Sequence, residues 1–113
     1  MRITFLGGGN MATALVGGLL NHGVEASSIV VIEISADKRA HLEEIYAIRC
    51  LEVLEAEALR CDALVLSVKP HQMRETCLAL QGHLRAQLII SVAAGLRLVD
   101  ICRWLGGYQK VVR

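Results

Sequence analysis

The sequence predicts an α/β fold, in which a doubly wound and mostly parallel sheet is covered by helices on both faces to give three layers. Two observations favour it. Apolar runs of strand length alternate with stretches of helical periodicity along all 113 residues, and this alternation is typical of parallel pairing with right-handed crossovers. The run at 63–68 is apolar at almost every position, as expected for a strand buried on both faces.

Six strands are expected, and each ends at a turn residue or a helix signal. They are Ile3–Leu6, 29–34, a weak strand at 47–51, then 63–68, 87–92, and a last strand that begins at Lys110. The chain stops inside this last strand. Because domains seldom end there, we expect residues 1–113 to be a single domain cut from a longer chain.

Helices are expected in the intervals between these strands. The first begins near Met11 and ends near Gly23, the second is N-capped by Ser35, and the third opens with Pro70. A short helix is expected at 54–60 and a final one at 98–105. In the second helix, the apolar spacing predicts an inward face made of Leu42, Ile45 and Tyr46.

Composition excludes several functions. The net charge is +1, and the 12 basic residues are spread along the chain with few aromatic residues among them, so no nucleic-acid partner is expected. No apolar stretch reaches the about 20 residues that cross a bilayer, and no secretion signal is recognisable, so we expect a cytoplasmic protein without membrane contact. The spacing of cysteines and histidines fits no metal site, and we expect none.

The segment Gly7-Gly8-Gly9-Asn10-Met11-Ala12 fits the pattern G-x-G-x-x-G/A. It follows the first strand directly and opens the first helix, which is the context that a dinucleotide-binding loop requires. Gly7 permits the tight turn, Gly9 lets the backbone approach a pyrophosphate, and Ala12 is small enough for close helix packing. The free N–H groups of the helix then attract the phosphates. The two glycines at 17 and 18 also indicate close packing of this helix.

Three interpretations of the end of the second strand remain open. Glu33 follows Ala12 by 21 residues, where a carboxylate binds the adenosine ribose of NAD and repels the 2′-phosphate of NADP. However, Ser35, Lys38 and Arg39 follow at once, and a hydroxyl with two cations suits a 2′-phosphate. A third possibility is that Glu33 points into solvent.

Three motifs together resemble pyrroline-5-carboxylate reductases. They are Phe5 to Ala12, then Val68-Lys69-Pro70-His71, then Ile90-Ser91-Val92-Ala93-Ala94-Gly95. The tail from Trp104 to Arg113 resembles the segment that precedes a Met-Pro-Asn-Thr-Pro motif in that family. The resemblance covers the whole chain in register, but only the N-terminal domain of the family. The stretch Leu51-Glu52-Val53-Leu54 lacks the asparagine that the family often places there for the adenine.

The resemblance implies a set of cofactor-binding residues. The pyrophosphate would lie against Leu6, Gly7, Gly8, Gly9, Asn10 and Met11, and the adenosine ribose or its phosphate against Ser35. Glu33 and Arg39 join this set from their position and charge after the second strand, and Glu33 is unusual at a place where the family often has small residues. Ser67, Val68, Lys69 and Pro70 would line the middle of the cofactor, and Val92, Ala93 and Ala94 would lie near the nicotinamide. These last two segments follow central strands, where open α/β sheets bind ligands. No catalytic side chain is expected in this segment.

The reaction implied is the reduction of 1-pyrroline-5-carboxylate to proline by NADP or NAD in its reduced form, with this chain supplying the cofactor-binding half. A helical domain beyond Arg113 would carry the substrate site and form a homo-oligomer. Two alternatives remain: a non-catalytic nucleotide-sensing module, and the first domain of a β-hydroxyacid dehydrogenase or a deazaflavin-dependent NADP reductase.

Overall fold

The computed structural model describes residues 1–93 and 95–113. Its strands are β1 (Ile3–Leu6), β2 (Ile29–Ile32), β3 (Arg49–Leu51), β4 (Ala63–Leu66), β5 (Leu88–Ser91) and β6 (Val111–Val112). Its helices are α1 (Asn10–Asn21), α2 (Ala36–Tyr46), α3 (Pro70–Leu80) and α4 (Leu98–Trp104), with 3-10 turns at Ala26–Ser28 and Ala56–Leu59.

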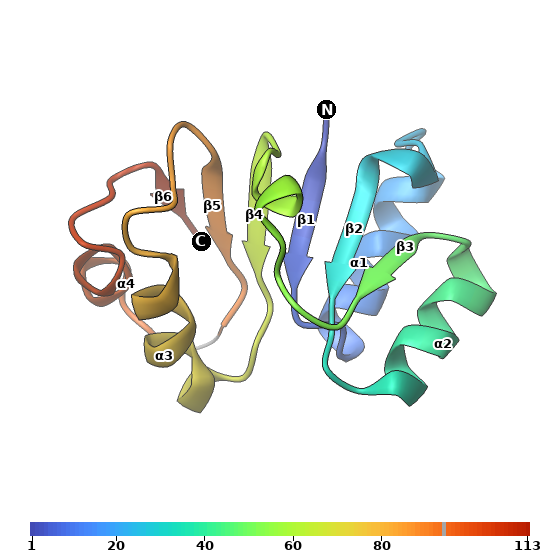
Figure 1. Cartoon of the computed structure of the whole chain (residues 1–113), viewed down its shortest axis with the longest axis horizontal. Coiled ribbons are helices and arrows are strands. Elements are labelled where there is room, and N and C mark those ends of the chain that lie inside the picture. Colours follow the sequence, from blue (N-terminus) through green and yellow to red (C-terminus); the bar gives the residue numbers. More distant parts are fainter. Residues whose placement is uncertain (94) are drawn as a thin grey trace.

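The six strands form one parallel sheet in the order β3-β2-β1-β4-β5-β6 (Figure 1). β1 lies in the middle, with Leu6 in register with Ile32 of β2 and Leu66 of β4. The chain thus runs outward from β1 to β3, returns to β4, and runs outward again. This parallel strand order confirms the predicted fold class. Doubly wound sheets bind ligands at the reversal, which here lies between β1 and β4.

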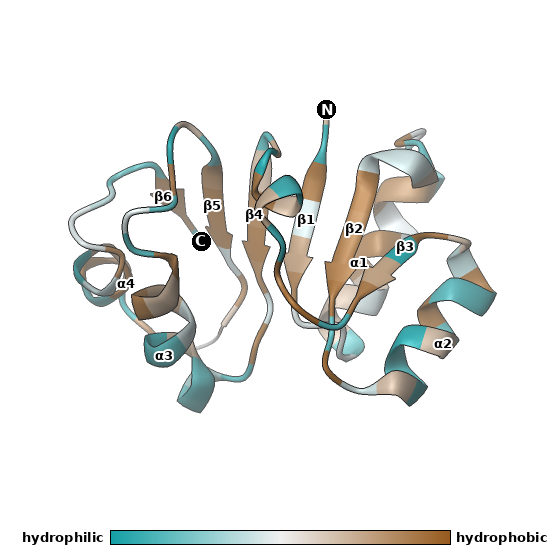
Figure 2. Cartoon of the chain, in the orientation of Figure 1, coloured by the Kyte–Doolittle hydropathy of each residue, from teal (hydrophilic) through white to brown (hydrophobic). Residues whose placement is uncertain are grey.

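Alternate residues of the strands point to opposite faces and build two separate cores. Phe5, Val31 and Val65 pack with α1 and α2 on one face. Leu6, Leu64 and their neighbours pack with α3 and α4 on the other. Because both faces are covered, most strand positions are apolar, and the strands of Figure 2 are mostly brown. The result is the expected three layers.

Close packing of α1 against α2 depends on one glycine. A Cβ atom added at Gly17 would lie 2.5 Å from the Oη atom of Tyr46, so this position cannot hold a larger residue without movement. At Gly18, no atom lies within 4 Å of an added Cβ. The expectation of close packing is therefore confirmed for Gly17 and wrong for Gly18.

Several expected boundaries were wrong. The strands end earlier than their apolar runs, at Ile32, Leu66 and Ser91, and the helix expected at 54–60 is a single 3-10 turn. Ile45 was expected to point inward and is 50% exposed. α2 covers the edge of the sheet beside β3, where Leu42 and Tyr46 already fill the space beneath it, so the neighbouring position faces solvent.

Candidate functional site

The loop between β1 and α1 turns sharply at Gly7. This residue has φ of +101°, and a Cβ atom there would lie 2.7 Å from the carbonyl oxygen of Ser67. Its N–H donates to the carbonyl oxygen of Ile32 at 2.8 Å. Both the backbone conformation and the lack of space require glycine, so the role expected for Gly7 is confirmed.

Gly9 is constrained differently. It is the N-cap of α1 with φ of −76°, and a Cβ atom added there would meet nothing within 4 Å. The protein itself therefore does not require glycine at this position. What glycine provides here is open space above the loop, on the side from which a ligand would approach the backbone.

The first turn of α1 offers hydrogen-bond donors. No side chain caps the helix, and no acidic residue lies in its first turn. The first intrahelical bond runs from the N–H of Thr13 to the carbonyl oxygen of Gly9. The N–H groups of Gly9, Asn10, Met11 and Ala12 have no acceptor among the described residues. Free amides at the positive end of a helix form an anion-binding site.

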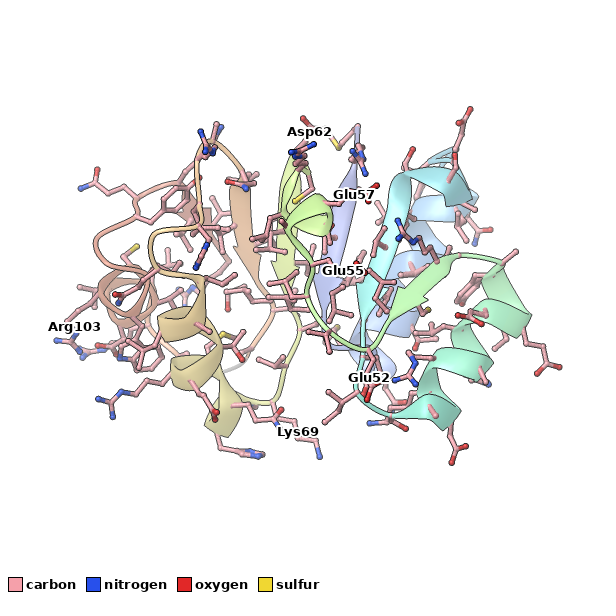
Figure 3. All side chains as sticks on the ribbon, in the orientation of Figure 1. Glu52, Glu55, Glu57, Asp62, Lys69 and Arg103 are labelled. Carbon is pink, nitrogen blue, oxygen red and sulfur yellow. The ribbon has the colours of Figure 1, made fainter. Side chains whose placement is uncertain are left out.

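Ser67, directly after β4, fastens the loop from the other side. Its Oγ atom lies 2.9 Å from the carbonyl oxygen of Leu6 and 2.8 Å from that of Gly7, and its single hydrogen can be donated to either. Val68 and Lys69 follow at the same edge of the sheet. In Figure 3, Lys69 lies at the carboxyl ends of the strands, and Asp62 lies at the opposite edge.

Glu33 is not a solvent-exposed side chain. It is 9% exposed. Its Oε1 atom accepts a hydrogen bond from the N–H of Gly8 at 2.9 Å, and its Oε2 atom accepts one from the N–H of Ser35 at 2.8 Å. A Cβ atom at Gly8 would lie 3.1 Å from the Cβ atom of Glu33, so the middle glycine of the loop is kept small by this contact.

The polar residues after β2 hold the corner between β2 and α2. Ser35 is the N-cap of α2, as expected, and its Oγ atom accepts a hydrogen bond from the N–H of Lys38 at 3.3 Å. Arg39 donates from Nη1 to the carbonyl oxygens of Glu33 and Ile34 at 2.8 and 3.0 Å. Its guanidinium group is therefore engaged by the backbone.

One cleft of about 480 Å³ joins these segments along the carboxyl edge of the sheet. Nine of the sixteen expected residues line it: Leu6, Gly7, Gly8, Gly9, Glu33, Ser35, Ser67, Val68 and Lys69. Asn10, Met11, Arg39, Pro70, Val92 and Ala93 are not among its lining residues. Ala94 lies outside the described residues.

Lys38, already considered from the sequence as a cation for a 2′-phosphate, lines the cleft from α2. One part of the cleft wall was not expected: Gln72, Glu75 and Thr76 line it from the first two turns of α3. Their spacing in α3 places them on its polar side, opposite the buried Met73 and Cys77. The polar face of α3, a helix that begins shortly after the carboxyl end of β4, was the feature of the sequence that could have predicted these residues.

The thiols indicate no redox or metal chemistry of their own. Burial raises the pKa of Cys77 to about 11 and, together with nearby Glu43, that of Cys50 to about 11. These groups are protonated at neutral pH and poor nucleophiles. Within residues 1–93 and 95–113, no cluster of side chains suits a metal ion, and no helix is long and apolar enough to cross a membrane.

Fold and site together define the class of protein, a Rossmann-type α/β domain with a glycine-rich loop at the carboxyl end of its first strand. A family model described as "NADP oxidoreductase coenzyme F420-dependent" matches residues 2–95. The chain belongs to this family.

The relatives most informative about this chain are pyrroline-5-carboxylate reductases. The pyrroline-5-carboxylate reductase of Pseudomonas aeruginosa is 42% identical over 113 residues, which is 99% of this chain and 41% of that protein. Among solved structures, the pyrroline-5-carboxylate reductase from Coxiella burnetii superposes with a TM-score of 0.86 at 38% identity, over 93% of this chain and 40% of its own. The chain thus spans about two fifths of the relatives that it matches.

A second solved structure shares the fold at lower identity. The Plasmodium falciparum pyrroline carboxylate reductase with NADP bound has a TM-score of 0.82 at 22% identity, over 98% of this chain and 40% of that one. The resemblance to pyrroline-5-carboxylate reductases drawn from the three motifs is confirmed by these matches. The expectation of NADP or NAD as the cofactor agrees with the family description, which names NADP.

Proposed function

We propose that this chain is the cofactor-binding part of an enzyme that reduces 1-pyrroline-5-carboxylate to proline with NADPH or NADH. The observation that carries the proposal is the 42% identity to the Pseudomonas aeruginosa reductase, which extends over 99% of this chain. The open space at Gly9 supports it independently, because a ligand explains a glycine that the fold does not need.

The residues of the loop fit the pyrophosphate of a dinucleotide. Gly9 leaves the approach to the backbone free, and the amides of Gly9, Asn10 and Met11 offer donors at the positive end of α1. Met11 is 56% exposed, so contact with a ligand here requires no rearrangement of the core. Gly7 and Ser67 hold the loop in this shape before any ligand arrives, which lowers the entropy cost of binding.

The carboxyl ends of β4 and β5 would hold the rest of the cofactor. Val68 and Lys69 line the cleft, and we assign the middle of the cofactor to them and to Pro70. We assign the nicotinamide to the segment with Val92 and Ala93, where the small side chain of Ala93 leaves room for a flat ring. When bound, the reduced nicotinamide supplies the hydride. The chain's contribution is to position it.

The remaining parts of the proposal concern the longer protein. By analogy with its relatives, a further domain would carry the site for 1-pyrroline-5-carboxylate and would assemble the protein into a homo-oligomer in the cytoplasm. We assign no catalytic side chain to residues 1–113. The chain on its own is expected to bind the cofactor weakly and to form no proline.

A chimera tests this function. We would join this chain to the C-terminal part of the Pseudomonas aeruginosa reductase, in place of the 41% of that protein that it matches, and follow oxidation of NADPH and NADH with 1-pyrroline-5-carboxylate. Proline formation by the chimera, with loss of activity in its Gly9→Val form, is the expected result. A folded chimera that binds cofactor but forms no proline would contradict the assignment.

The family description names a second candidate, a reductase that exchanges a hydride between NADP and coenzyme F420, which is a deazaflavin. The relatives that match 99% of the chain favour the first candidate. Supplying the chimera with reduced F420 and NADP, without 1-pyrroline-5-carboxylate, separates the two.

A further inference from the structure

The carboxylate of Glu33 is a fixed negative charge in the wall of the cleft. Both of its oxygens are held by backbone amides, those of Gly8 and Ser35. Among the described residues, no lysine, arginine or histidine forms an ion pair with it. Backbone amides hold the group in place without neutralising its charge, so it acts on any ligand group that enters the cleft beside it.

Two of the three residues that would favour a 2′-phosphate already form hydrogen bonds with the backbone. Arg39 donates to the carbonyl oxygens of Glu33 and Ile34, and it is not part of the cleft wall. The hydroxyl of Ser35 serves as the N-cap of α2. Lys38 is the one basic side chain of this corner that lines the cleft. The cleft wall at this corner therefore carries one exposed lysine and one buried carboxylate whose position is fixed.

We infer that Glu33 makes this chain select NAD(H) over NADP(H), an inference that rests on the proposed function. Each carboxylate oxygen keeps a free lone pair after accepting one amide hydrogen, and this lone pair can accept from the ribose 2′-hydroxyl of NAD(H). In NADP(H), a phosphate with a charge near −2 replaces that hydroxyl. The phosphate has no hydrogen to donate, and like charges would then lie side by side.

This selectivity distinguishes the chain from what its family description suggests, since that description names NADP. A purely structural role for Glu33 predicts something different. If the carboxylate only supported the glycine loop, its removal would weaken both dinucleotides by the same factor. The ratio of the two affinities therefore separates selection from support.

The experiment is a calorimetric titration of the chain with NADH and NADPH, repeated with ADP-ribose and 2′-phospho-ADP-ribose to isolate the adenosine end. We expect the wild-type chain to bind NADH at least about tenfold more tightly than NADPH. In Glu33→Gln, which keeps the shape of the side chain without its charge, the ratio should fall below about threefold. Asp37→Asn is the matched control. It removes a carboxylate from the exposed first turn of α2, outside the cleft wall, and should keep the wild-type ratio.

Three results would overturn the inference: equal or tighter binding of NADPH by the wild-type chain, an equal loss of both affinities in Glu33→Gln, or a changed ratio in Asp37→Asn as large as that in Glu33→Gln. The wild-type ratio needs no variant, so equal or tighter binding of NADPH would overturn the inference even if Glu33→Gln does not fold. Absence of binding for all four ligands would instead refute the proposed function, and the inference with it.

Discussion

The hydroxyl oxygen of Ser67 lies 2.8 Å from the carbonyl oxygen of Gly7 and ties the end of β4 to the loop that follows β1. These residues are 60 positions apart in sequence, yet they meet at the point where the strand order reverses. The side chain therefore supports the loop from the side of β4.

Replacing Ser67 by alanine should loosen the loop. We expect Ser67→Ala to lower the free energy of unfolding by about 1 kcal/mol, the usual net contribution of one hydrogen bond, and to weaken dinucleotide binding several-fold. Urea denaturation and calorimetric titration measure the two effects. Ser27→Ala, at an exposed position of the first 3-10 turn, should change neither. Unchanged affinity in Ser67→Ala would show that the loop keeps its shape without this bond.

Substitutions of the first and third loop glycines should affect different properties, stability at Gly7 and cofactor affinity at Gly9. Gly7→Ala forces a Cβ atom against the backbone of Ser67 at a positive φ, so it should cost about 2 kcal/mol or more in stability. Gly9→Val meets no protein atom near its Cβ position and should change stability by less than about 0.5 kcal/mol. Its affinity for NADH should nevertheless fall at least about tenfold, because the side chain fills the ligand's approach. If Gly9→Val bound the cofactor normally, the loop assignment would be wrong.

The neighbouring helix glycines offer a similar contrast in stability alone. Gly18→Ala should stabilise the chain by up to about 1 kcal/mol, because alanine favours the helix and the added methyl group meets no atom. Gly17→Ala should destabilise it, since its methyl group would collide with the ring of Tyr46. Thermal denaturation of both variants is sufficient. Equal effects at the two positions would contradict the packing of α1 on α2.

Alkaline pH should destabilise the chain through its buried thiols. Burial raises the pKa of Cys77 from its ordinary value of 9.0 to about 11. Below pH 9, the thiol is neutral in both states, and its contribution is constant. Between about pH 9 and 11, it ionises in the unfolded chain first, so the folded chain binds more protons and stability falls as pH rises. The loss of stability over this range should be smaller in Cys77→Ala, measured by urea denaturation at each pH. An identical pH dependence in both proteins would refute the assignment.

Local chemistry explains which parts of the fold could be predicted. The order of elements followed from apolar runs and turn residues, and Gly7, Ser35 and Pro70 occupy the positions that their conformational preferences require. Strand ends were harder to place. Glu33 and Val68 come directly after apolar strand residues, so the sequence pattern extended the strands to include them. Backbone pairing with β1 ends earlier, at Ile32 and Leu66, and a single sequence does not show which residues pair.

The candidate site was predictable to the extent that it is built from backbone. The glycine loop and the segments that follow β2 and β4 were identified because glycines and buried strands leave clear patterns in a sequence. Gln72 and Thr76 were missed because their place in the cleft depends on how α3 lies over the sheet. The hydrogen bonds from Arg39 to two backbone carbonyl oxygens could not be predicted either, because the sequence does not show which acceptor a guanidinium group will bind.

The contact between Gly8 and Glu33 has a consequence for anyone who wishes to redesign this corner. The glycine leaves room for the acidic side chain, and the acidic side chain in turn satisfies the glycine's amide. A smaller neutral residue at position 33 would therefore leave a hole and an unsatisfied donor at the base of the loop. A change of coenzyme preference at this corner should therefore replace Glu33 by a neutral residue of the same length that still accepts from the amide of Gly8, as glutamine does.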